Sequence, residues 1–140
     1  MEIYAISSRK YRYIRGAVRK FLTNGKPSKC YDVVKYVAKM MGYIVNDNSY
    51  RCKICGKRFD KKVQLVNHIR SHGKEIDELV SKVIAAYVCA DTMHSYGRCK
   101  ICGKRFTRNK SPRYKPVRHM IEKHPKELWE RIVQAKITTF

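Results

Sequence analysis

Apolar residues recur at the spacing of a helix face in four segments of the chain. They predict helices at 9–22, 29–41, 75–88 and 125–135. Ser8 and Ser28 stand at the N-cap positions of the first two. The 75–88 segment has the fullest stripe, with apolar residues at i, i+3, i+4, i+7 and beyond. A stripe of that width must be covered by neighbouring helices or by the same stripe of a second copy.

A nine-residue repeat lies between these helices. The sequence RCKICGKRF occurs identically at 51–59 and 98–106. The sequence that follows also recurs, because HGKEIDELVSKVI at 72–84 resembles HPKELWERIVQAKI at 124–137. We therefore expect two diverged copies of a helix–finger–helix unit that share the 75–88 helix.

Two histidines follow the first copy of the repeat and complete a set of zinc ligands. The set is Cys52, Cys55, His68 and His72, and zinc prefers four such ligands in a tetrahedron. Two residues between the cysteines place both thiolates on one tight turn. Three residues between the histidines place both imidazoles on one face of a helix. A redox Cys-x-x-Cys pair is the alternative reading, and it leaves the histidines unexplained.

The second copy leads to a similar set, Cys99, Cys102, His119 and His124, with four more residues between its cysteines and histidines. Two residues outside both sets, Cys30 and Cys89, are predicted to be small buried hydrophobic side chains, with a mutual disulfide as the alternative.

Proline at position 116 sets the second copy apart. Pro116 stands three residues before the first histidine, where the first copy has Leu65. Proline suits the start of a helix and disrupts its interior. We therefore expect the second finger helix to begin near Pro116, after an extended basic loop at 107–115. Val117 or Tyr114 would then take the place of Leu65.

Residues 50–72 resemble the C2H2 zinc finger family. The family motif is intact as Tyr50, Cys52, Cys55, Phe59, Leu65, His68 and His72. The resemblance implies a small α+β protein in which two ββα C2H2 zinc fingers, each holding one Zn²⁺, are set in a mainly helical scaffold. Two zinc ions are therefore expected as cofactors. A hairpin and helix this short need the metal to fold, at about 10 kcal/mol of binding energy.

The resulting division of the chain has five parts. They are a basic N-terminal helical region at 1–48, zinc finger 1 at 49–73, an amphipathic connecting helix at 74–95, zinc finger 2 with its extended loop at 96–124, and a C-terminal helix at 125–140.

The charge of the chain points to an anionic partner. The net charge is +21 and the isoelectric point is about 10.0. Residues 51–74 and 98–124, which hold the ligand sets, carry +7 and +9, whereas 75–97 carries −3. Nucleic acid, an acidic protein and an anionic membrane all fit such a surface. No apolar run of about 18 residues is present, so a membrane partner is not expected.

The family resemblance implies which residues contact nucleic acid. In the family, three positions of the finger helix meet successive bases in the major groove, and here they are Lys61, Gln64 and Asn67. Their side chains suit an adenine-rich triplet with a guanine at its 3′ side. The alternative is that these three side chains are ordinary solvent-exposed residues of the helix and bind no partner.

Basic residues of the two fingers are predicted to contact phosphates, which positions a protein on DNA without conveying sequence. They are Arg51, Lys53, Lys57, Arg58, Arg98, Lys100, Lys104, Arg105, Arg108, Lys110, Arg113, Lys115 and Arg118. The 9–22 helix is also basic. A DNA-reading helix-turn-helix formed by 9–22 and 28–41 is the alternative to plain packing with contacts to the DNA backbone.

These features favour a zinc-dependent transcriptional regulator that binds double-stranded DNA. The alternatives are a double-stranded RNA-binding zinc finger protein and a zinc-stabilised adaptor for protein interactions, and the apolar helices could also support a homodimer. An enzyme is not expected, because every ligand position of both zinc ions is filled by the chain.

The compact duplicated fingers also resemble small regulators of archaeal viruses. We expect an intracellular, DNA-associated protein, in the host cytoplasm if viral or the nucleus if eukaryotic, that is not secreted.

Overall fold

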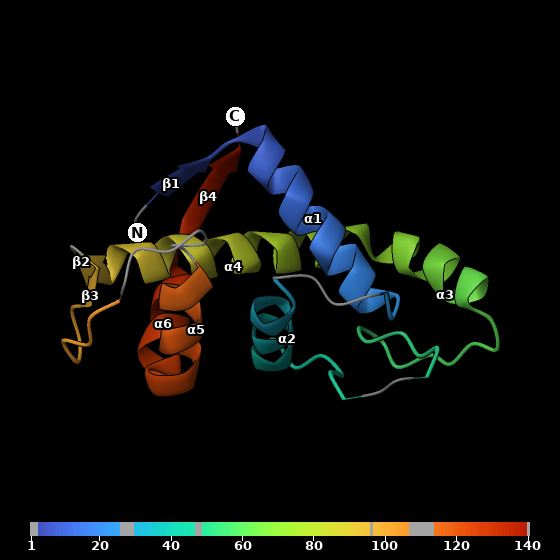
Figure 1. Ribbon diagram of the computed structural model, residues 1–140. Coiled ribbons are helices and arrows are strands. Elements are labelled where there is room, and N and C mark those ends of the chain that lie inside the picture. Colours follow the sequence, from blue (N-terminus) through green and yellow to red (C-terminus); the bar gives the residue numbers. More distant parts are fainter. Residues whose placement is uncertain (1–2, 26–29, 47–48, 96, 107–113, 140) are drawn as a thin grey trace.

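The fold was obtained as a computed structural model, which describes residues 3–25, 30–46, 49–95, 97–106 and 114–139 (Figure 1). The elements in chain order are β1 Ile3–Ile6, α1 Ser8–Leu22, α2 Tyr31–Met40, α3 Lys62–Ile69, the 3₁₀ helix η1 Arg70–His72, α4 Gly73–Thr92, β2 His94–Ser95, β3 Arg98–Cys99, α5 Tyr114–Lys123, α6 Pro125–Gln134 and β4 Lys136–Thr139.

Helix α4 is the centre of the molecule. It runs across the middle of Figure 1, with α3 at one end and the β2–β3 hairpin at the other. Helices α1, α2, α5 and α6 all pack against it. At a rise of about 1.5 Å per residue, its 20 residues separate the two fingers by about 30 Å. Within the described residues, no helix is both long and apolar enough to span a membrane.

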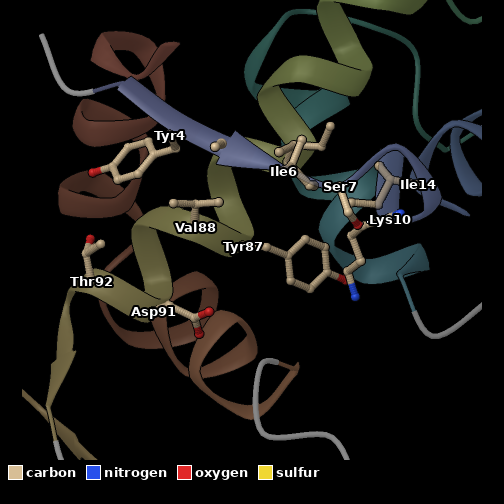
Figure 2. A pocket seen from close by; sticks show the side chains of 11 residues that line it. Tyr4, Ile6, Ser7, Lys10, Ile14, Tyr87, Val88, Asp91 and Thr92 are labelled. Atoms are coloured by element: carbon tan, nitrogen blue, oxygen red, sulfur yellow. Dashed lines mark hydrogen bonds between the residues drawn. The ribbon is translucent and has the colours of Figure 1, made fainter. Parts of the chain in front are cut away.

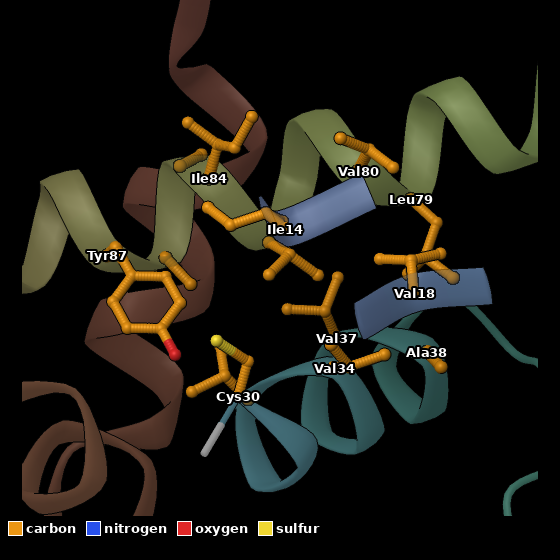
Figure 3. Close-up of a cluster of buried hydrophobic side chains, with 14 of the residues drawn as sticks. Ile14, Val18, Cys30, Val34, Val37, Ala38, Leu79, Val80, Ile84 and Tyr87 are labelled. Carbon is orange, nitrogen blue, oxygen red and sulfur yellow. The ribbon is translucent and has the colours of Figure 1, made fainter. Parts of the chain in front are cut away.

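The apolar stripe of α4 forms the core, as its periodicity predicts. Leu79, Val80 and Ile84 are fully buried. Figure 3 shows Leu79 beside Val18 of α1, with Val34, Val37 and Ala38 of α2 on the same side of α4. The stripe is therefore covered by helices of the same chain. A homodimer through the apolar helices stays a prediction, and it would have to use surfaces other than this stripe.

Helix boundaries agree closely with the apolar pattern, and the capping residues differ. Helix α1 covers Ser8–Leu22, but its N-cap is Ser7, whose hydroxyl accepts a hydrogen bond from the backbone of Lys10 at 3.3 Å. The proposed cap Ser28 lies outside the described residues. Helix α4 is longer than 75–88, because η1 leads directly into it from finger 1.

The two ends of the described chain pair with each other. Strands β1 and β4 form a parallel ladder in which Ile3 is opposite Lys136 and Ile6 is opposite Thr139. The C-terminal segment 125–140 is therefore a helix followed by a strand, and the expectation of a helix alone is corrected. Runs of four residues are too short to predict a strand, and this pairing is long-range.

A pocket of about 510 Å³ lies beside β1, between the start of α1 and the second half of α4. Figure 2 shows Tyr4 from β1 and Asp91 from α4 at its edge, with Lys10 on the opposite side near the ring of Tyr87. The charges on its walls are mixed.

The two cysteines outside the ligand sets are both buried, as the sequence predicts. Cys30 precedes α2 and is 5% exposed, and Cys89 of α4 is fully buried. Neither forms a disulfide, so the disulfide alternative is wrong.

Replacing Leu79 with alanine should remove core contacts at the centre of the scaffold. We expect the free energy of unfolding to fall by about 2–5 kcal/mol, because a large buried side chain leaves a cavity behind. Val63, which is 68% exposed, supplies the control, since Val63→Ala should change stability by less than about 0.5 kcal/mol. Denaturant titrations of the zinc-loaded proteins measure both. Equal effects would contradict the central position of α4.

Candidate metal centres and nucleic-acid interface

The knuckle of each finger is the same backbone turn, as the identical nonapeptide requires. Cys52 N–H donates to the Lys57 carbonyl at 2.8 Å, and Gly56 N–H donates to the Cys52 carbonyl at 2.8 Å. The same two bonds occur in finger 2. Gly56 and its counterpart Gly103 have φ of 84° and 77°, in the left-handed region that side chains disfavour. Each turn therefore directs the Sγ atoms of its two cysteines toward the same metal site.

The four predicted ligands of finger 1 meet at one site. His68 Nε2 lies 3.2 Å from Cys55 Sγ and 3.1 Å from His72 Nε2. The ligand atoms of all four residues, Cys52 included, lie within 4.8 Å of one another. A zinc tetrahedron with bonds of about 2.05 Å to nitrogen and about 2.3 Å to sulfur has edges of about 3.3–3.8 Å. The donor set therefore fits Zn²⁺.

Finger 2 brings together its own four ligands despite the longer interval. Cys102 Sγ lies 3.3 Å from His119 Nε2, and the ligand atoms of Cys99 and His124 lie within the same 4.8 Å group. The Nε2 atom of His124 is buried and has no hydrogen-bond partner. Such an orphaned nitrogen, beside two cysteines, is the arrangement that a metal ion satisfies. The two ligand sets support two Zn²⁺ ions.

The surroundings of the ligands favour the protonation states that bind zinc. Burial lowers the pKa of His68 and of His119, with a further contribution from the second histidine of each pair. The neighbouring imidazole of His124 is the largest of the influences that lower the pKa of Cys102 to about 7. Burial has the opposite effect on Cys52, whose pKa is raised. Neutral imidazoles and thiolates are the forms that coordinate the metal.

His94 takes part in finger 2, which the sequence does not indicate. Its ring lies 5.0 Å from that of Phe106 and 6.2 Å from that of His119. In finger 1 the Phe59 N–H donates to the Tyr50 carbonyl, and in finger 2 the Phe106 N–H donates to Gly97. Gly97 thus holds the backbone position of the leading aromatic residue, while His94 supplies a ring to the small core.

The finger 1 helix presents its predicted base-reading residues to solvent. Helix α3 begins at Lys62, immediately after Lys61, which agrees with the register used for the family positions. Lys61, Gln64 and Asn67 are all exposed. However, Gln64 Oε1 accepts hydrogen bonds from the backbone N–H groups of Asp60 and Lys61 at 3.2 and 3.3 Å. Gln64 therefore caps its own helix, and bidentate binding to adenine would break that cap.

The finger 2 helix is part of the core. Helix α5 begins at Tyr114, two residues before the predicted start at Pro116. Val117 is fully buried, in agreement with one of the two residues proposed for the Leu65 position, and Met120 is also fully buried. The helix packs against α2, α4 and α6. The loop residues proposed as phosphate contacts, Arg108, Lys110 and Arg113, lie outside the described residues.

Lys53 is not placed to contact a phosphate, and this prediction is corrected. It is only 3% exposed, and its ammonium group donates to the side chain of Asn24 and lies 5.3 Å from the centre of the Phe21 ring. Asn24 in turn donates to the Ser49 carbonyl at 2.6 Å. These contacts attach the finger 1 knuckle to the end of α1.

The equivalent lysine of finger 2 has the same role. Lys100 Nζ donates to the Thr92 carbonyl at 2.9 Å, and its backbone N–H donates to the Met93 carbonyl at 2.9 Å. Both carbonyls lie at the C-terminal end of α4, where the helix dipole favours a cation. Both knuckles are therefore fixed to helix ends of the scaffold.

Other predicted phosphate contacts are on the surface. Lys57 and Arg58 of finger 1, and Arg98, Lys104 and Arg105 of finger 2, are exposed. Arg51 is half-buried, and its Nε donates to the Gly56 carbonyl at 3.1 Å.

A basic groove of about 420 Å³ crosses finger 2. Lys104, Lys115, Arg118 and Lys123 line it. Arg118 also donates to Glu122 at 3.1 Å, so part of this charge is balanced within the chain.

The comparisons with known proteins agree with the geometry of finger 1. Residues 50–72 match the family model described as the zinc finger of C2H2 type. No curated protein and no solved structure matches the chain. A C2H2 finger implies a zinc-dependent, typically nucleic-acid-binding function, and the family generally consists of binding modules.

Loss of one zinc ligand should destabilise the protein more when the ligand belongs to finger 2 than when it belongs to finger 1. Cys55→Ser and Cys102→Ser replace the second cysteine of each knuckle, and both residues are exposed. Each variant should bind one zinc ion where the wild type binds two, as measured by elemental analysis. The melting temperature should fall further for Cys102→Ser, because the α5 side chains Val117 and Met120 belong to the scaffold core. Equal decreases would contradict that difference.

Lys53→Ala should lower stability without changing the surface charge that a ligand meets. The change removes the hydrogen bond from Lys53 to Asn24 and the contact with the Phe21 ring, and we expect a loss of about 1–3 kcal/mol in denaturant titrations. Lys57→Ala, in the same knuckle but exposed, is the matched control and should change stability by about 0.5 kcal/mol or less. If Lys57→Ala were the more destabilising of the two, the anchoring role of Lys53 would be wrong.

Proposed function

We propose that this chain, whose residues 50–72 form a C2H2-type zinc finger, is a zinc-dependent protein that binds double-stranded DNA and regulates transcription. The observation that carries the proposal is the exposed outer face of α3, where Lys61 and Asn67 stand at base-reading positions on a helix fixed to a rigid scaffold. The net charge of +21 supplies the attraction to phosphates.

Asn67 is the strongest base-reading side chain in this proposal. An asparagine can donate to N7 and accept from N6 of adenine, and a bidentate pair of this kind contributes about 1–3 kcal/mol of discrimination. Lys61 favours guanine at the 3′ side of the triplet. Gln64 contributes less to readout, because its oxygen caps α3.

Finger 2 has a different role in the proposed complex. Its helix α5 is packed against three other helices, so it has little freedom to enter a groove in the manner of α3. Its exposed residues, among them Lys104, Arg105 and Arg118, suit contacts to the DNA backbone. The separation of about 30 Å along α4 approaches one turn of B-DNA, about 34 Å. One protein can thus contact a duplex at two places.

Two other functions make different predictions. A protein that recognises double-stranded RNA by shape should prefer RNA in direct competition, and it should show no base preference. A protein-interaction adaptor should bind neither polymer in a zinc-dependent way.

Selection from a random duplex library, with zinc and with a chelator, tests the proposal. We expect enrichment only with zinc, and affinity that falls by one or more orders of magnitude between 50 and 200 mM salt for 6–10 phosphate contacts. Asn67→Ala should erase the preference at one base, while Gln64→Ala should alter it less. Lys126→Ala, an exposed change on α6, serves as the control. Selection of no sequence by the wild type, or a preference for RNA, would refute a sequence-selective DNA-binding role.

A further inference from the structure

Helix α3 has three faces, and each has a different environment. Leu65 and His68 face the knuckle, where the His68 ring lies 5.0 Å from that of Phe59. Gln64 and Asn67 form the exposed face. The third face does not touch the knuckle and lies toward α1, and it forms one wall of a groove outside both zinc centres.

The groove has a volume of about 300 Å³ and is bounded by α1 on one side and by α3, η1 and the start of α4 on the other. Its floor is apolar and its edges are basic. The lining residues are Arg15, Arg19, Lys20, Thr23, Val66, Ile69, Arg70, Gly73 and Ile76.

Four cations and no carboxylate line this groove. Asp77 is not part of this lining, and its carboxylate is 4.0 Å from the Arg15 guanidinium, beyond hydrogen-bond distance. The Nε atom of Arg15 is buried without a hydrogen-bond partner. Arg19, Lys20 and Arg70 are exposed. Such a concentration of positive charge favours an anion with several oxygen atoms, and a phosphate group is one.

The groove flanks the base-reading face of α3. Residues three apart on a helix are neighbours about 60° apart around its axis, so Arg70 lies next to Asn67. Around the helix axis, Arg70 lies on the side of Asn67 that is away from His68. His68 is on the face that packs against the knuckle. The knuckle and the groove therefore lie on opposite sides of the base-reading face.

A duplex that receives α3 in its major groove has one phosphate backbone on each side of the helix. In such a complex the knuckle residues Lys57 and Arg58 would lie toward one backbone. The groove residues Arg19, Lys20 and Arg70 would lie toward the other.

We propose that α1 and the end of α3 form a second phosphate-binding site, which holds the DNA strand opposite to the one contacted by the finger 1 knuckle. This inference rests on the proposed DNA binding and adds a partner surface that lies outside the zinc finger motif. In this proposal α1 binds the phosphate backbone of the DNA. It does so without acting as a helix-turn-helix together with α2.

The double variant Arg19→Gln/Lys20→Gln tests the site and leaves the Arg15–Asp77 contact intact. Binding of a short mixed-sequence duplex is measured between 50 and 200 mM salt with zinc-loaded full-length chain. Loss of two phosphate contacts should make the slope of log affinity against log salt shallower by about 2, and should weaken binding about tenfold or more at 0.1 M salt. Base preference should be unchanged.

Lys126→Gln/Arg131→Gln, two exposed residues of α6, is the control of equal charge, and its slope should stay close to that of the wild type. Zinc content and melting temperature of both variants establish that they are folded. Neutral methylphosphonate linkages, placed in one strand of the selected duplex at a time, supply a second readout. Neutralising the strand opposite to the knuckle should weaken the wild type and have little effect on the Arg19→Gln/Lys20→Gln variant.

The outcomes separate the inference from the proposed function. If the wild type binds duplex DNA with zinc but the groove variant keeps the same slope, the second phosphate-binding site is overturned and DNA binding stands. An acidic protein segment would then be the better occupant of the groove. If the wild type does not bind the duplex, both the second phosphate-binding site and the proposed function fail.

Discussion

The burial of the α4 apolar face is the interaction on which both fingers depend. Helix α4 begins at Gly73, the residue after the last ligand of finger 1, and ends at Thr92, seven residues before the first ligand of finger 2. Its buried side chains contact α1, α2, α5 and α6 at the same time. Moving one finger relative to the other would therefore expose core surface, at about 25 cal/mol for each Å². The two zinc centres belong to one body.

The two identical nonapeptides have different structural surroundings, so the helices that follow them differ in exposure. In both copies a helix begins directly after the last histidine, α4 at Gly73 and α6 at Pro125. In finger 1 the run from α3 through η1 to α4 leaves the outer face of α3 in solvent. In finger 2 the helix α5 is enclosed by three others. The first finger is thus shaped to present side chains, and the second to stabilise the scaffold while its rim stays basic.

Positive charge in this protein has two uses that composition alone does not separate. Lys53 and Lys100 are part of the repeat, yet their ammonium groups bind scaffold residues at helix ends. Arg19 and Lys20 belong to no motif, and the packing of α1 places them beside α3. The distinction follows from burial and from nearby acceptors, because a desolvated ammonium requires a fixed hydrogen-bond partner.

The sequence alone determined the local features: both ligand sets, the register of α3 and the approximate bounds of α1, α4 and α6. These follow from spacing along a helix or a turn, which a chain encodes within a few residues. Tertiary structure decided what depends on distant residues. It paired β1 with β4, placed His94 in finger 2, buried Lys53, engaged Gln64 as a cap and brought α1 to the side of finger 1. Such contacts depend on how the helices pack, which local spacing does not specify.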